Sequence, residues 1–209
     1  MALGFFITFE GGEGAGKSTQ LSRLAQRLEA AGRDLVRTRE PGGSPGAEAI
    51  RSLLVTGEAD RWSPITETLL MYAARRDHVE RVIAPALARG AVVLCDRFAD
   101  STRAYQGAGG GAPSGLISAL EAEVLGDLRP DLTLILDLPT ASGLARAAGR
   151  GGGEARFESK DLAFHERLRA GFLAIARAEP DRCRIIDATS AEAVVGAGVW
   201  AEVRALITQ

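Results

Sequence analysis

Residues 11–18 read Gly-Gly-Glu-Gly-Ala-Gly-Lys-Ser and fit the phosphate-loop pattern G-x-x-x-x-G-K-[ST]. The apolar residues 5–9 precede this stretch and are typical of a buried strand, and leucines follow it at helical spacing over residues 21–28. A strand, a glycine-rich loop and a helix in this order direct backbone N–H groups and the positive end of the helix toward a polyphosphate. The pattern predicts that Lys17 reaches the β- and γ-phosphates of a nucleotide and that the Ser18 hydroxyl faces Mg²⁺. The nucleotide-binding residues expected from it are Gly11, Gly12, Glu13, Gly14, Ala15, Gly16, Lys17, Ser18 and Thr19.

The composition is that of one globular α/β domain. The chain has 209 residues with 46% apolar residues, enough for a substantial core but short for two domains. A net charge of −2 argues against a broad nucleic-acid footprint, which needs a basic face. The sequence has neither an apolar run of membrane-spanning length nor a basic and apolar N-terminal leader, so we expect no membrane partner and a cytoplasmic location. Cys95 and Cys183 lack metal-site spacing and are expected to be small buried apolar groups.

Five apolar runs alternate with segments of helical periodicity. This alternation predicts an α/β fold with a five-stranded parallel sheet and helices on both faces. Pro85 is expected to kink a long helix that Gly90 ends, and the glycine-rich residues 107–115 are expected to form a loose stretch. Strands are expected at 5–9, 35–38, 91–95, 132–136 and 184–186. Helices are expected after the phosphate loop, after residue 97, and at 47–55, 64–90, 116–125, 141–148, 162–178 and 191–206.

Polar residues follow three of the expected strands. Glu13 lies in the phosphate loop, Arg39 and Glu40 follow the second strand, and Asp96 and Arg97 follow the third. Ligands of parallel sheets bind beyond the carboxyl ends of the strands, so these side chains should converge. One polyphosphate cradle faced by two further arginines indicates phosphoryl transfer between two phosphates, with Asp96 holding Mg²⁺ directly or through water. The alternative for the two arginines is surface salt bridging, which contributes little stability.

A run of glycines at 149–153 is flanked by Arg146, Arg150 and Arg156. Consecutive glycines resist a fixed conformation, and arginine is suited to stabilising charge on a transferring phosphoryl group. A mobile lid around residues 146–158, closing over the nucleotide, would explain both features. The alternative is a flexible solvated loop.

Several segments together resemble the bacterial thymidylate kinases. The resemblance runs through nearly the whole chain, in order and at compatible spacings, and the combination is far more specific than the phosphate loop alone. It implies a single P-loop nucleotide kinase domain over residues 1–209, which transfers the γ-phosphoryl group of ATP to dTMP, gives dTDP, requires Mg²⁺ and forms a homodimer through its long helices. The matching segments are EGGEGAGKSTQ (10–20), TREPGG (38–43), AAR (73–75), DRF (96–98), STRAYQG (101–107) and RPDLT (129–133).

The resemblance also implies roles for residues of the acceptor site. Glu13 would accept a hydrogen bond from the deoxyribose 3′-hydroxyl, a role suited to a carboxylate. Arg39 and Arg97 would hold the acceptor phosphate, for which the guanidinium geometry is suitable. The other acceptor residues implied are Arg75 on the thymine carbonyl, Ser101 and Thr102 on the base edge, Tyr105 crowding the 2′ position, and Gln106 beside them.

Members of this family carry the catalytic arginine either in the phosphate loop or in the lid. Gly14 occupies the loop position here, so the resemblance assigns that work to the lid, to Arg150 with Arg146 or Arg156. The catalytic residues expected are Lys17, Arg97, Arg146, Arg150 and Arg156.

Two positions depart from the family pattern. Met71 stands where a phenylalanine usually stacks on thymine, and a methionine sulfur can also contact an aromatic ring favourably. Tyr72 could take that role, but one position along a helix points it about 100° away. Arg103 replaces an uncharged residue and could alter base selectivity. No catalytic role is expected for His78, which matches the family, or for His165.

Two other functions remain open from the residues. A different nucleoside monophosphate kinase or a deoxynucleoside kinase would share the loop and lid, but a deoxynucleoside kinase needs a carboxylate base for a neutral hydroxyl. Arg39 and Arg97 favour a monophosphate acceptor, which is already ionised. A nucleotide-dependent binding switch is the second alternative. The chain contains no asparagine, which excludes the Asn-Lys-x-Asp form of guanine recognition.

Overall fold

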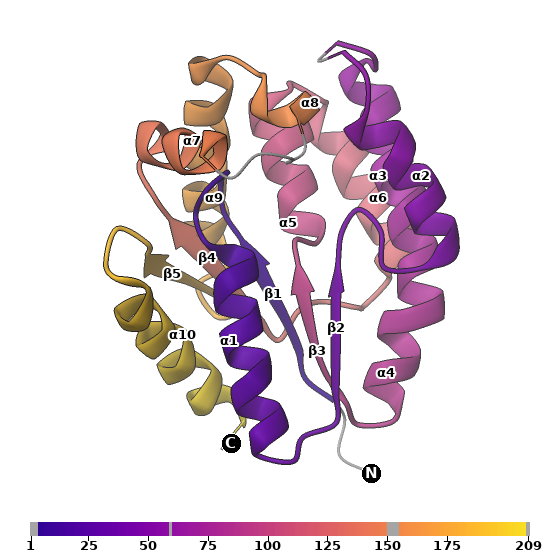
Figure 1. Ribbon diagram of the computed structural model, residues 1–209. Helices are drawn as coiled ribbons and strands as arrows, with labels where there is room; N and C mark the ends of the chain where they lie inside the picture. The colour runs from indigo at the N-terminus through magenta and orange to yellow at the C-terminus, as the bar shows by residue number, and fades with distance from the viewer. Residues whose placement is uncertain (1–3, 59, 150–154, 208–209) are drawn as a thin grey trace.

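The sheet has five parallel strands in the order β2-β3-β1-β4-β5, in a computed structural model that describes residues 4–58, 60–149 and 155–207 (Figure 1). The expected α/β fold is confirmed, and each strand lies within one or two residues of its predicted position. β1 is central because it pairs with both β3 and β4, so the phosphate loop leaves the middle of the sheet. The strands are β1 (Phe6–Glu10), β2 (Leu35–Arg39), β3 (Val92–Asp96), β4 (Leu132–Asp137) and β5 (Cys183–Asp187).

Helices cover both faces of the sheet. Figure 1 shows α1 (Lys17–Ala30) and α10 (Glu192–Ile207) in front of it and α9 (Leu162–Ala178) behind it. In the described segments, no helix is long and apolar enough to cross a lipid bilayer. The other helical segments are α2 (Pro45–Val55), α3 (Pro64–His78), η1 (Val79–Ile83), α4 (Ala84–Ala88), α5 (Ala99–Thr102), η2 (Arg103–Gly109), α6 (Ser114–Leu125), α7 (Thr140–Ala148) and α8 (Ala155–Glu158), of which η1 and η2 are π-helical.

The core is divided by the sheet into two apolar layers. Successive side chains of a strand point to opposite faces, so Ile7 and Phe9 pack toward α1 and α10 while Phe6 packs toward η1 and α4. All three are fully buried. The two cysteines are buried and unpaired, as expected. Both faces of the central strands are therefore covered, which explains their continuous apolar sequence.

The long helix expected at 64–90 is present but changes form along its length. The π-helical turn η1 lies just before Pro85, and α4 then continues to Ala88. A proline removes one N–H and crowds the carbonyl four residues earlier, and a local π-turn is one way in which a helix absorbs this disturbance. Gly90, with φ +87°, follows the end of the helix.

The expectation of a loose stretch at 107–115 is wrong at both ends. The π-helical segment η2 continues through Gly109, and α6 begins at Ser114. A Cβ on Gly109 would lie 2.7 Å from the ring of Phe164, and one on Gly171 would lie 2.7 Å from Ala108. These glycines allow η2 and α9 to pack closely, so they serve helix packing rather than a turn.

Candidate active site

The phosphate loop links β1 to α1 with glycines where the backbone requires them. Gly14 has φ +66°, and a Cβ there would lie 2.0 Å from the carbonyl oxygen of Gly143. Lys17 begins α1, and its ammonium donates to the carbonyls of Gly11 (3.2 Å) and Gly12 (2.9 Å). Burial and the neighbouring charge of Arg97 lower the pKa of Lys17. The loop thus holds a buried cation among aligned backbone groups, an arrangement that binds polyphosphates.

Ser18 and Asp96 place two oxygen atoms side by side at the mouth of the loop. The Ser18 hydroxyl donates to the carboxylate of Asp96 at 2.5 Å, although the residues are 78 positions apart. Across residues 4–58, 60–149 and 155–207, no group of three or more His, Cys, Asp or Glu side chains could hold a metal ion. Mg²⁺ needs no such group, because it is usually bound by one or two protein oxygens, waters and substrate phosphates. The oxygen pair therefore fits the Mg²⁺ predicted from the sequence.

Arg97 lies between the phosphate loop and a deeper pocket. Its guanidinium donates to the Gly11 carbonyl at 3.0 Å and to the Glu13 carboxylate at 3.1 Å, and it lies 4.7 Å from the ring centre of Tyr105. The backbone of Arg97 has φ +72°, the left-handed region that favours glycine. Such a conformation costs about 1 kcal/mol or more in a residue with a side chain, and strained residues of this kind cluster at functional sites.

Glu13 is the carboxylate that faces Arg97. Its Oε1 also accepts a hydrogen bond from the Tyr105 hydroxyl at 2.5 Å. Burial alone would raise the pKa of Glu13, but the charges of Arg97 and Lys17 outweigh it and lower the pKa to about 2. At neutral pH the side chain is therefore ionised and acts only as a hydrogen-bond acceptor.

The deeper pocket contains most of the acceptor residues expected from the sequence. It encloses about 330 Å³, including its open mouth, and has mainly apolar walls. Arg97 belongs to its lining and also contacts the phosphate loop, so pocket and loop share a boundary. The lining residues predicted from the sequence are Met71, Arg75, Arg97, Ser101, Thr102, Tyr105 and Gln106.

Arg75 carries an unused donor in this pocket. Its Nε donates to Glu40 at 2.7 Å, and its Nη2 donates to the Phe98 carbonyl at 3.1 Å and to Thr102 at 3.0 Å. The remaining nitrogen, Nη1, is buried and has no acceptor among the described residues. A buried donor without an acceptor is costly, so a ligand that places an oxygen opposite Nη1 would be bound selectively.

Two other expected acceptor residues, Ser101 at the base edge and Gln106 beside it, already make hydrogen bonds within the protein. The Ser101 hydroxyl donates to Glu10 at 2.6 Å, and the Gln106 amide donates to Glu67 at 2.7 Å. Burial, reinforced by the charge of Asp100, raises the pKa of Glu10 to about 8. In this structure the two side chains shape the floor of the pocket through buried carboxylates rather than presenting those donors to it.

Arg39 lies apart from this pocket. Its guanidinium pairs with Glu48 at 3.0 and 3.1 Å, and 54% of the side chain is exposed. It lines an open groove beside Ser18 and Asp96. The structure therefore brings Arg39 to the same end of the sheet as Arg97 but not into the pocket.

The two lid arginines that the structure describes lie in different places. Arg146 donates to the Ala188 carbonyl at 3.2 Å and lines a groove between the phosphate loop and residues 188–192. Arg156 is buried, pairs with Glu67 and donates to the Leu54 carbonyl at 3.1 Å, so it anchors α8 against α2 and α3. Arg150 lies outside the described residues. Of the expected lid, residues 146–148 end α7 (Thr140–Ala148), and residues 155–158 form α8.

The sequence did not indicate three parts of the site. Phe157 of α8 lines the acceptor pocket and packs edge-on against Tyr105, at 5.6 Å between ring centres. The buried carboxylate of Glu40 holds both Arg75 and His78. The groove beside residues 188–192 offers space next to the phosphate loop. The position of Glu40 at this edge of the sheet was expected but its pairing with Arg75 and His78 was not, and no local pattern marks Phe157.

Comparisons with known proteins agree with this geometry. The thymidylate kinase family matches residues 9–197. The thymidylate kinase of Caulobacter vibrioides is 77% identical over 188 residues, 90% of each chain, and that of Nitrobacter hamburgensis is 56% identical over 203 residues, 96% of this chain and 88% of the relative. The crystal structure of thymidylate kinase from Ehrlichia chaffeensis superposes with a TM-score of 0.78 at 36% identity, covering 96% of this chain and 98% of the other. The chain therefore belongs to the thymidylate kinase family.

Proposed function

We propose that the protein transfers the γ-phosphoryl group of ATP to dTMP and releases dTDP and ADP. One observation carries the proposal. Arg97 contacts both the phosphate loop, at the Gly11 carbonyl, and Glu13, and it lines the acceptor pocket. A cation at this boundary can hold the acceptor phosphate next to the phosphoryl group that is transferred.

The donor nucleotide is bound by residues of the phosphate loop and of the adjoining groove. The loop amides and Lys17 hold its phosphates. Residues 188–192 and Arg146 border the groove that continues from the loop, and this groove accommodates the nucleoside. Ser18 and Asp96 are the side chains that would hold Mg²⁺, which neutralises charge on the phosphates when it is bound.

The acceptor nucleotide is held at its phosphate, its sugar and its base. Arg97 binds the phosphate, with Arg39 reaching it after release from Glu48. Glu13 accepts the 3′-hydroxyl, and Tyr105, fixed by its bond to Glu13, restricts the 2′ position. The unused Nη1 of Arg75 donates to a thymine carbonyl.

Apolar side chains complete the base site. Met71 and Phe157 line the same pocket as Arg75, so the aromatic face that Met71 lacks is provided by α8. Thr102 accepts from Arg75 and orients its guanidinium.

The transfer requires no base. An oxygen of the dTMP phosphate is already ionised and attacks the γ-phosphorus. The bond from the γ-phosphorus to the β–γ bridging oxygen breaks, and ADP departs with that oxygen. Lys17, Arg97 and the lid arginines stabilise the charge that spreads over the transferring group. In this proposal Arg150 acts with Arg146, whereas Arg156 holds α8 through its bond to Glu67.

The proposal includes a homodimer and a cytoplasmic location. Two large apolar residues of α3, Ile65 and Leu69, lie one helical turn apart, and each exposes nearly half of its surface. An exposed apolar stripe on a long helix supports an interface between two copies of the chain.

The test is ADP release from Mg·ATP with dTMP, dUMP, UMP, CMP, AMP, GMP or thymidine as the acceptor. We expect dTMP to be turned over far faster than UMP and thymidine. If another monophosphate is turned over faster, the assignment of the phosphate loop stands, but the base site proposed around Met71, Arg75 and Thr102 is rejected. Hydrolysis without any acceptor preference would support a nucleotide-dependent switch instead.

A further inference from the structure

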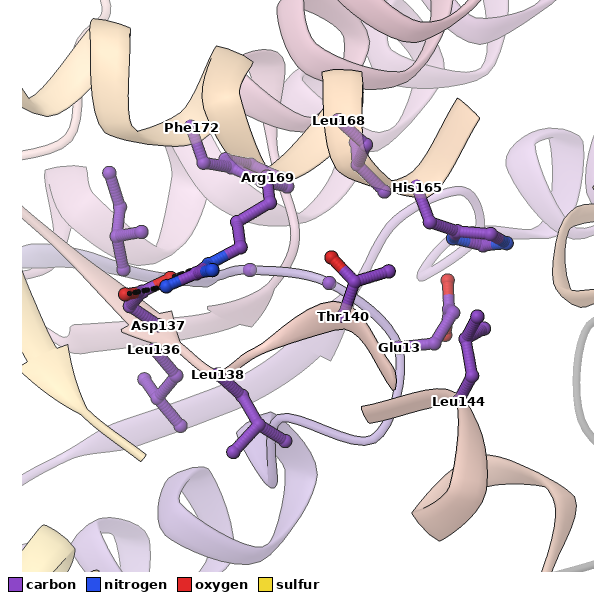
Figure 2. A pocket seen from close by; sticks show the side chains of 13 residues that line it. Glu13, Leu136, Asp137, Leu138, Thr140, Leu144, His165, Leu168, Arg169 and Phe172 are labelled. Atoms are coloured by element: carbon purple, nitrogen blue, oxygen red, sulfur yellow. Dashed lines mark hydrogen bonds and ion pairs between the residues drawn. The ribbon is translucent and has the colours of Figure 1, made fainter. Parts of the chain in front are cut away.

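A second cavity lies beside the phosphate loop, with a lining largely different from that of the acceptor pocket. It is bounded by the loop at Glu13, by the start of α7 at Thr140 and by α9 at His165 (Figure 2). An ion pair between Asp137 and Arg169, at 2.7 and 2.9 Å, closes one side of it. The site proposed above makes no use of this cavity.

Two polar atoms in the cavity lack partners. The side-chain hydroxyl of Thr140 and the Nε2 of His165 are both buried, and neither has a hydrogen-bond partner among the described residues. The two residues expose only 8% and 3% of their surfaces. They come from different helices and line the same small space. Buried polar atoms of this kind are nearly always bonded to protein or to ordered water.

The cavity has room for ordered water. It encloses about 400 Å³, including its open mouth. Leu138, Leu144 and Leu168 form apolar parts of the wall, while Asp137 and Arg169 line the cavity as an ion pair. Among the described lining residues, Thr140 and His165 carry buried side-chain atoms that lack a partner, so a water placed here would bond to them and to the loop near Glu13.

Glu13 has one carboxylate edge available to this cavity. Arg97 and Tyr105 both bind the same oxygen, Oε1, from the acceptor side. Figure 2 shows the carboxylate end of Glu13 directed toward the ring of His165. His165 is also near enough to contribute to the lowered pKa of Glu13, after the larger effects of burial, Arg97, Lys17 and Tyr105.

We propose that ordered water in this cavity links Thr140 and His165 to the carboxylate of Glu13, and that the two are positioning residues for the acceptor 3′-hydroxyl. The inference rests on the proposed function, because contact with the 3′-hydroxyl is the role proposed for Glu13. Held by Arg97 and Tyr105 on one side and by water on the other, the carboxylate keeps a single orientation when the acceptor binds. Such preorganisation improves binding because less freedom is lost.

Matched variants of Thr140 distinguish the effect of losing its hydroxyl from the effect of changing its packing. Thr140→Val removes the hydroxyl and keeps the shape, and Thr140→Ser keeps the hydroxyl. We expect Thr140→Val and His165→Leu to raise the KM for dTMP roughly threefold to tenfold, the effect of one lost hydrogen bond, with little change in the KM for ATP. Thr140→Ser and His165→Gln should lie close to the wild type. A KM for dTMP that is unchanged in Thr140→Val, or raised equally in Thr140→Ser, would overturn the proposal.

An acceptor without the 3′-hydroxyl tests whether Thr140 affects acceptor binding through Glu13. With 3′-deoxy-dTMP, the penalty of Thr140→Val should disappear, because the group that Glu13 binds is missing. A penalty of the same size with both acceptors would overturn the positioning role. If Glu13→Gln does not change the KM for dTMP in the otherwise wild-type protein, the role proposed for Glu13 itself fails, and this result is distinct from a failure of the water link.

Nitrogen NMR of the imidazole rings provides a readout that does not depend on activity. The chain has two histidines, so the spectrum contains one pair of ring signals from each. His78, the last residue of α3, bonds Glu40 and Thr38 and serves as an internal control. Thr140→Val and Glu13→Gln should each shift the ring signals of His165 and leave those of His78 in place. Unchanged His165 signals in both variants would overturn the proposal.

Discussion

Arg97 and Glu13 form an ion pair with 3.1 Å between Nη2 and Oε1, and the two side chains are about nine-tenths buried. The pair joins the end of β3 to the phosphate loop that follows β1. Either side chain would be costly to bury without the other. Replacing one of them therefore leaves an uncompensated charge on its partner.

Two replacements of Arg97 distinguish the contribution of its side chain to catalysis from the strain in its backbone. Arg97→Ala and Arg97→Gly remove the same contacts, so both should lower kcat by roughly a hundredfold or more. Because φ is +72° at this position, the glycine variant should be more stable than the alanine variant by about 1 kcal/mol. Steady-state kinetics and urea unfolding measure the two effects. Wild-type-like turnover would remove Arg97 from the site, and equal stability of the variants would show that the strain is absent.

Lys17→Ala should lower kcat by several orders of magnitude while the protein remains folded, because the loop loses the only cation that it contributes to the phosphates. Lys160→Ala, at the other lysine of the chain, is the matched control and should retain activity. Circular dichroism confirms folding in both variants. Comparable turnover in the two would contradict the assignment of Lys17.

Replacing Arg150 and replacing Arg156 should have different kinds of effect. Arg150→Ala should slow transfer more than it raises the KM for dTMP, because its charge is needed by the transferring group. Arg156→Ala should instead destabilise the protein by about 3 kcal/mol, because the buried carboxylate of Glu67 loses the cation that pairs with it and is left with the neutral amide of Gln106. Single-turnover kinetics and thermal unfolding distinguish the two. A change confined to the KM for dTMP in Arg150→Ala would reject the lid role.

Phe157→Leu should raise the KM for dTMP roughly threefold to tenfold and leave the KM for ATP unchanged, because the pocket loses the aromatic ring contributed by α8 but keeps most of its volume. Adding Met71→Phe should recover part of this loss, since residue 71 lines the same pocket. Phe164→Leu, which removes an aromatic neighbour of Tyr105 outside the pocket lining, controls for packing. If Phe164→Leu has the same effect as Phe157→Leu, a direct contact with the base is rejected.

Glu10 should make the free energy of unfolding depend on pH. Its pKa is raised from 4.5 to about 8, so between these values the folded protein binds more protons than the unfolded chain. The contribution of Glu10 to stability therefore falls as the pH rises through this window. Urea unfolding at pH 5.5 and at pH 8.5 should show Glu10→Gln gaining stability relative to the wild type at the higher pH. A constant difference between the two proteins would show that Glu10 is ionised in the folded state.

The fold was predictable because its signals are local. Apolar runs, helical spacing and the glycine loop each lie within a few residues of one another, and the strand positions followed from them. The continuation of η2 through Gly109 was not predictable, because the reason for these glycines is the ring of Phe164, far along the chain. Tertiary packing decided whether those glycines formed a turn or a close helix contact.

The acceptor site was predictable only in part. Arg75, Thr102 and Tyr105 lie in one pocket, as the resemblance implied. The pairing of Arg39 with Glu48 and the burial of Arg156 against Glu67 depend on competing carboxylates, which sequence spacing does not reveal. Phe157 was missed because an apolar residue in a polar segment has no pattern that distinguishes a pocket wall from ordinary core.

The base pocket and the phosphate loop come from different parts of the fold. Side chains of α3, α5, η2 and α8 line the pocket proposed for the base, whereas the residues proposed to hold phosphate lie at the ends of β1 and β3. With the proposed site, the two can diverge separately. A lineage that moves the aromatic wall from residue 71 to residue 157 would change the base pocket and leave the residues proposed to hold phosphate as they are.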